Sequence, residues 1–177
     1  MSDWAPGIHA DTISAGLLIG RLVVGLGMAA HGSQKLFGWF GGKGLAGTTG
    51  YFESLGFRPG RVFALLAGLG EFTSGLLVAL GFLGPVGPAL MMAVMIVAAA
   101  QSWAKGFFAM NGGIELPLLY ASAALALSFI GPGRFSLDAA LGIAPWSNLK
   151  LVAVAVGVAV VGAVGSLAVR HPATAAR

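Results

Sequence analysis

Ionisable side chains interrupt the apolar stretches of this chain, and they are the residues best suited to chemistry. The clearest are Arg21, His31 and Glu71, together with the amide of Gln101. A charge in membrane hydrocarbon costs about 2.5–3.5 kcal/mol on insertion scales, so such residues usually face a protein interior and act there. Histidine titrates near neutral pH and can relay a proton or donate a hydrogen bond to a carbonyl. These residues predict a site that combines proton transfer with hydrogen bonding.

Other polar and aromatic residues extend this predicted site. We expect catalytic, proton-transferring roles for His31, Glu71 and Glu115. We expect ligand-binding roles for Arg21, Lys35, Gln101, Trp103 and Asn111. Aromatic residues crowd one end of the apolar segments, the end at which Lys35 and Lys105 lie. Polar groups beneath such an aromatic rim suit a flat, amphiphilic ligand.

Several of these residues also have a purely structural interpretation. Glu115 stands two residues before Pro117, and an acidic residue in the first turn of a helix complements the helix dipole. Asn111 is equally suited to cap a helix. His31 can serve helix packing by bonding a backbone carbonyl.

The composition excludes several kinds of site. The chain has no cysteine, which removes disulfides, thiolate-bound metals and iron–sulfur clusters. His9 and His171 lie near the chain ends, so His31 has no histidine partner for a haem, and we expect no metal, haem or flavin. The net charge is +4, but the lysines and arginines form no basic run, so nucleic acid is not an expected partner.

Five apolar segments are long enough to position these residues on membrane-spanning helices. Of 177 residues, 57% are hydrophobic and 9% charged, whereas soluble domains carry about 25% charged residues. A spanning helix needs roughly 20 apolar residues, and no segment shows the period-two alternation of a barrel strand. The predicted spans are residues 13–37, 61–83, 86–107, 114–130 and 149–169.

The distribution of lysine and arginine predicts an orientation. One side of the membrane would hold Lys35, Lys43, Arg58, Arg61, Lys105, Arg170 and Arg177, and the other Arg134 and Lys150. The positive-inside rule then predicts a protein of the cytoplasmic (inner) membrane with an external N-terminus and a cytoplasmic C-terminus. The expected units are an external segment 1–12, a four-helix membrane domain 13–142, an extra transmembrane helix 149–169 and a cytoplasmic tail 170–177.

Depth within the membrane predicts an ion pair. If Lys35, Arg61 and Lys105 mark one boundary, a rise of 1.5 Å per residue puts Glu71 roughly 15 Å deep and Arg21 roughly 21 Å deep. We expect these two charges to pair, because either one alone is costly in low dielectric. The pair would serve the site or would only set the helix register.

The first loop is long enough to fold. Residues 48–56 predict a short helix with Tyr51, Phe52 and Leu55 on one face, lying in the plane of the membrane interface. It would act as an interfacial anchor or as a lid over the site.

The order of these motifs resembles the DoxX family of small bacterial membrane proteins, which is related to the DoxD subunit of thiosulfate:quinone oxidoreductase. The resemblance rests on Arg21, Phe57, Glu71 with Gly75, and the motifs HGSQKLFG (31–38), NGGIELP (111–117) and GPGRFSLD (131–138). It implies an all-α, polytopic four-helix membrane bundle, and in some members an association with quinone-linked oxidoreductases or oxidative-stress complexes. The span 149–169 is an addition to that pattern, and its small residues favour packing or homo-oligomerisation.

Two functions fit these observations. The first is a quinone-interacting oxidoreductase subunit, in which the protein binds a quinone or other small amphiphile and a substrate or redox partner protein supplies electrons. The second is a non-catalytic membrane subunit that anchors or assembles a partner complex. A transporter is disfavoured, because no span is interrupted at its midpoint and no inverted repeat is visible.

Overall fold

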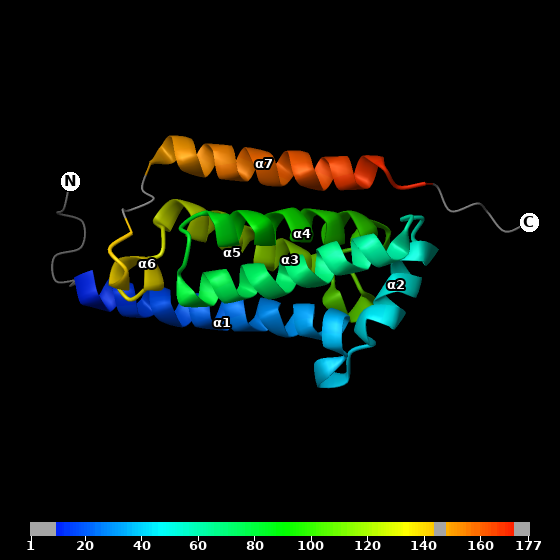
Figure 1. Cartoon of the computed structure of the whole chain (residues 1–177), viewed down its shortest axis with the longest axis horizontal. Coiled ribbons are helices and arrows are strands. Elements are labelled where there is room, and N and C mark those ends of the chain that lie inside the picture. The colour runs from blue at the N-terminus through cyan, green and yellow to red at the C-terminus, as the bar shows by residue number, and fades with distance from the viewer. Residues whose placement is uncertain (1–9, 144–147, 172–177) are drawn as a thin grey trace, which may run out of the picture.

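The computed structural model describes residues 10–143 and 148–171, and within these ranges every regular element is helical. Figure 1 shows the elements in chain order. The α-helices are α1 (Ala10–Phe37), α2 (Gly44–Ser54), α3 (Gly60–Leu80), α4 (Val86–Ser102), α5 (Glu115–Ile130), α6 (Leu137–Ala140) and α7 (Leu149–Ala168). Short 3₁₀ turns are η1 (Trp39–Gly41), η2 (Trp103–Lys105) and η3 (Ala109–Asn111).

The helices α1, α3, α4 and α5 form an up-and-down bundle, with α7 alongside it (Figure 1). One end of the bundle carries α2 and the C-terminal end of α7, and we call it the α2 end. The opposite end carries α6 and the tight α3–α4 turn, and we call it the α6 end. The core between the helices is rich in methionine, including Met28, Met91, Met92 and Met95.

Glycines bring α1 and α3 into direct backbone contact. A Cβ added at Gly25 would lie 2.6 Å from the carbonyl oxygen of Gly75, and one added at Gly32 would lie 2.4 Å from the nitrogen of Phe72. Small residues at such contacts let transmembrane helices approach closely and gain packing energy. This interlocking sets which residues of α1 and α3 lie at the same height.

The helix α2 begins earlier than the residues 48–56 expected for it, and its aromatic face divides between two environments. Phe52 is buried and its ring packs 5.4 Å from that of Phe57, whereas Tyr51 remains exposed. The Thr48 hydroxyl lies 3.2 Å from the Lys35 carbonyl, which joins α2 to the end of α1. The element therefore packs on the bundle through Phe52 and is more than a surface anchor.

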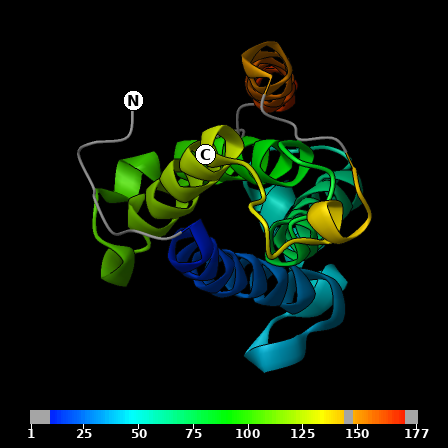
Figure 2. The same cartoon turned by 90° about the vertical axis from the view of Figure 1, so that its left-hand side faces the viewer.

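The added helix α7 packs against α4 and α5 on the outside of the bundle (Figure 2). Its buried residues are Val152, Ala159 and Ala163. At its C-terminal end, Arg170 Nε donates to the Leu55 carbonyl (2.6 Å) and the His171 amide donates to the Gly56 carbonyl (2.9 Å). These bonds attach α7 to the loop between α2 and α3.

The predicted spans correspond to helices of the structure, with small shifts at their ends. The helices α1, α3 and α7, and α4 continued through η2, are long and apolar enough to cross a membrane. The helix α5 is apolar but has only 16 residues, a rise of about 24 Å against a hydrocarbon core of about 30 Å. The chain is an all-α, polytopic integral membrane protein. Residues 1–9 of the predicted N-terminal segment and 172–177 of the predicted tail lie outside the described residues.

Candidate functional site

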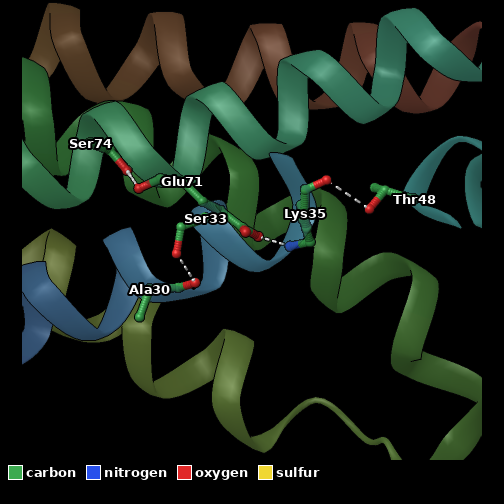
Figure 3. Close-up of polar contacts among 6 residues, drawn as sticks. All are labelled: Ala30, Ser33, Lys35, Thr48, Glu71 and Ser74. Carbon is green, nitrogen blue, oxygen red and sulfur yellow. Dashed lines mark hydrogen bonds and ion pairs between the residues drawn. The ribbon is translucent and has the colours of Figure 1, made fainter. Parts of the chain in front are cut away.

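The best-defined polar site in the described part of the chain is an ion pair between α1 and α3. Lys35 Nζ bonds Glu71 Oε1, with the Lys35 side chain 33% exposed and Glu71 only 2% exposed. Figure 3 shows the two side chains pointing toward each other across the helix interface. The lysine thus connects a buried carboxylate to the edge of the bundle.

The second carboxylate oxygen of Glu71 has no hydrogen-bond partner in the described protein, although it is fully buried. The neighbouring hydroxyls are already used locally: Ser33 donates to the Ala30 carbonyl (2.8 Å) and Ser74 to the carbonyl of Glu71 itself (3.2 Å) (Figure 3). A buried polar atom without a partner costs free energy, and such atoms usually indicate an unassigned water, ligand or catalytic role. Glu71 Oε2 is therefore the atom of this ion pair that still lacks a hydrogen-bond donor.

An aromatic pair joins α1 to α5 one helical turn before Lys35. The rings of His31 and Tyr120 meet edge to face at a centroid distance of 5.9 Å. The Tyr120 hydroxyl lies directly over Gly27, where an added Cβ would be 2.5 Å away. The structure thus shows two separate contacts, the Lys35–Glu71 ion pair and the His31–Tyr120 ring pair, and His31 is exposed.

Tyr120 was missed by the sequence reasoning. The available signal was a tyrosine placed well inside a predicted span, five residues after Glu115, whereas tyrosines of membrane proteins are enriched at the interfaces.

The predicted pair of Arg21 with Glu71 is wrong. Arg21 is 2% exposed, and its Nη2 donates to the carbonyl of Phe135, near the α6 end. Lys35 takes the place expected for Arg21.

The helix register explains this correction. Gly68 of α3 contacts Lys35 and Leu36, so Lys35 lies at the height of Gly68. The predicted depths had instead placed Lys35 level with Arg61. Arg21 instead lies against Gly81, just beyond α3. Glu71 and Gly81 are ten residues apart, and this separates the two charges by roughly 15 Å along the helix.

Arg21 belongs to a second buried cluster at the α6 end. Asp138 is 2% exposed and accepts hydrogen bonds from the backbone amides of Leu83 (2.9 Å) and Gly84 (2.8 Å). Its negative charge also attracts Arg21. Leu83 has φ +61°, an uncommon conformation for a residue with a side chain, so the carboxylate holds an otherwise unfavourable turn.

Glu115 fastens a loop in the structure. Its Oε2 accepts a hydrogen bond from the amide of Ala109 (2.8 Å), and its own amide donates to the carbonyl of Phe107 (2.9 Å). Asn111 closes η3 in the same loop and is exposed. These contacts give both residues a structural task, while their predicted functional roles stay predictions.

The other predicted ligand contacts lie toward the outside of the α2 end. Gln101 is half-buried near the end of α4, and Trp103 in η2 is 71% exposed. Several more aromatic side chains of this end are at least half exposed, namely Phe37, Trp39, Phe40, Phe107 and Phe108. Such a rim is typical of the membrane interface. Among the described residues, no hydrogen bond joins Gln101, Trp103 or Asn111 to Glu71.

The chemistry of the site follows from its members. The carboxylate of Glu71 accepts a hydrogen bond or a proton, Lys35 and Tyr120 can donate, and His31 can do either. Across residues 10–143 and 148–171, no three His, Asp or Glu side chains come together in a group that could hold a metal ion. The side chains of the site can therefore both donate and accept hydrogen bonds.

Comparison with known proteins identifies one relationship. The model of the DoxX family matches residues 16–106, just over half of the chain, and this range contains Arg21, His31, Lys35, Glu71 and Gln101. The matched range ends before Glu115, Tyr120 and Asp138. Neither the curated proteins nor the solved structures contain a match.

Proposed function

The chain belongs to the DoxX family, and from this premise we propose that it is a quinone-interacting oxidoreductase subunit with an intramembrane site at Glu71. The site would comprise Glu71, Lys35, His31 and Tyr120. The observation that carries the proposal is the fully buried Glu71 carboxylate, which pairs with Lys35 through one oxygen and leaves the other without a partner.

The donors and acceptors of the site fit the polar head of a quinone. A carboxylate accepts a hydrogen bond from the hydroxyl of the reduced form, while Lys35, Tyr120 and His31 can donate to the carbonyl of the oxidised form. A bound quinone would supply the redox chemistry, taking up two protons together with two electrons from a donor outside the polypeptide. The residues of the chain would bind and orient it and exchange protons with it at Glu71 Oε2 and His31.

The proposal includes a route for protons through Lys35 on the same side. Lys35 is one-third exposed and ends α1, so its ammonium lies between the buried carboxylate and the edge of the bundle. The cations of the α2 end support the proposal that this end faces the cytoplasm, as the positive-inside rule expects. The chain would then lie in the inner membrane, with its site near the cytoplasmic leaflet.

The test is the quinone content of the purified protein. We would solubilise the wild type and Glu71→Gln in lipid nanodiscs, extract them with organic solvent and quantify quinone per chain by mass spectrometry. The amide keeps the size of the carboxylate but removes its charge and its proton-accepting oxygen. Near-stoichiometric quinone in the wild type, lost in a folded Glu71→Gln protein, is the expected result.

Asp11→Asn is the matched control. It makes the same change of carboxylate to amide in an ion pair, with Arg134 (2.5 Å), but both of those side chains are mostly exposed. Its quinone content should equal that of the wild type. A wild type without quinone, or equal retention in all three proteins, would contradict the proposal.

A second candidate is a non-catalytic subunit that anchors a partner complex. The observation in its favour is α7, an apolar helix of which most of the surface remains uncovered in the single chain. A partner or a second copy that covers α7 would then co-purify in gentle detergent. In that case Glu71→Gln would lower the yield or partner recovery with no quinone present in either protein.

A further inference from the structure

An apolar groove lies between α7 and the rest of the bundle near the α2 end. Its volume is about 220 Å³. The lining comes from α2, α3, α4 and α7, and includes Phe52, Phe63, Leu66, Val94, Gly162 and Ser166. Glu71 is not part of it, because Glu71 faces α1 while Phe63 and Leu66 face α4 and α7.

The size and position of the groove restrict what fills it. Pockets that enclose a whole small molecule usually measure about 300–1,000 Å³, so this groove accommodates only part of one. The groove opens on the apolar flank of a membrane protein, where hydrocarbon chains are the surrounding solvent.

A cation stands at the α2 end of the groove. Arg170 lies two residues beyond the end of α7, and its guanidinium is 6.0 Å from the ring centroid of Phe57. That ring packs against Phe52 (5.4 Å) and Phe63 (4.9 Å), which line the groove.

The guanidinium keeps donors for a ligand. Arg170 is exposed and uses Nε for the Leu55 carbonyl, which leaves both Nη groups without a partner among the described residues. Arg58 and Arg61 are exposed on the adjoining loop and helix start. This charge complements an anionic headgroup.

We propose that this groove binds one acyl chain of an anionic phospholipid, with the phosphate held at Arg170. The lipid would fill the space between α7 and α3 and so join the added helix to the family bundle. The site is independent of quinone binding at Glu71, because it lies on another face of α3.

Gly162 allows a direct test. A Cβ at Gly162 meets nothing within 4 Å, so a larger side chain enters the groove without striking the backbone. Gly165 is equally free but does not line the groove, which makes Gly165→Leu the matched control for Gly162→Leu. We would incubate each detergent-solubilised protein with equal amounts of phosphatidylglycerol and phosphatidylcholine of the same chains, and count bound lipids by native mass spectrometry.

The wild type and Gly165→Leu should retain one phosphatidylglycerol, preferred about fivefold over phosphatidylcholine, as one cation near an anionic lipid predicts. Gly162→Leu should retain neither phosphatidylglycerol nor phosphatidylcholine. Arg170→Gln should retain one lipid but bind the two kinds equally. Circular dichroism checks folding, and Ser166→Leu replaces Gly162→Leu if that protein does not fold.

Equal lipid retention in Gly162→Leu and Gly165→Leu would overturn the proposal. So would a wild type without preference for the anionic lipid. The proposal would also be overturned if Gly162→Leu lost a bound quinone or a second copy of the chain and not a phospholipid.

Discussion

Lys35 of α1 neutralises Glu71 of α3, and it does so from the edge of the bundle, since its side chain is 33% exposed while the carboxylate is 2% exposed. The pair is therefore asymmetric: the lysine is partly exposed at the edge of the bundle and the carboxylate is enclosed. Loss of the lysine strands a charge in low dielectric, whereas loss of the carboxylate frees a lysine that can extend toward water.

This asymmetry predicts unequal effects of the two substitutions on stability. Lys35→Met should lower the free energy of unfolding by about 3 kcal/mol, because it leaves a buried carboxylate without its partner. Glu71→Gln should cost less, and the double variant should be more stable than the sum of the single effects predicts. Equilibrium unfolding in mixed detergent micelles measures all three. Additive effects would show that the two side chains do not interact.

The contact of α1 with α3 predicts a second difference, between two glycines of the same helix. Gly25→Ala should destabilise the protein by about 1–3 kcal/mol, the usual cost of overpacking, because the new Cβ would lie 2.5 Å from the nitrogen of Ala79. Gly20→Ala meets nothing within 4 Å and should be neutral or slightly stabilising, since alanine favours helix. Thermal unfolding followed by circular dichroism compares them. Equal melting temperatures would refute the close α1–α3 contact.

The Asp138 carboxylate predicts local protection of the α3–α4 turn. Asp138→Ala removes the acceptor for the amides of Leu83 and Gly84, and each buried donor left without a partner costs about 1–3 kcal/mol. Hydrogen–deuterium exchange should become faster at these two amides. Asp11→Ala is the control, because its exposed ion pair with Arg134 is worth about 0–1 kcal/mol. Unchanged exchange in Asp138→Ala would show that the turn is held by other contacts.

Glu115 can be assigned to structure or to chemistry by two variants. Glu115→Gln retains an oxygen that can accept from the Ala109 amide, so the loop and the melting temperature should be preserved. Glu115→Ala should lower the melting temperature, because that amide loses its acceptor. If Glu115 also transfers protons, Glu115→Gln will lose quinone turnover while remaining stable. A fully active Glu115→Gln protein would restrict the residue to loop structure.

The helical elements were predictable from local sequence, and the reasons are visible in particular residues. Gly81 ends α3 in a left-handed conformation, and Pro85 directly precedes the first residue of α4, Val86. The cluster at the α6 end was not predictable in the same way. Asp138 belongs to a recognisable motif, yet nothing in its spacing shows that it binds amides more than fifty residues earlier in the chain.

The amino-acid sequence by itself determined that this chain is a helical membrane protein and where its long apolar helices lie. These properties follow from composition and from hydropathy over about 20 residues, both of which are local. Only the tertiary structure decided that Glu71 pairs with Lys35 and that Arg21 turns to Phe135. Pairing depends on the relative height of α1 and α3. That height is set by the close contacts of Gly25, Gly32 and Gly75 across the interface of the two helices. No single segment of the sequence encodes these contacts, because they join two segments.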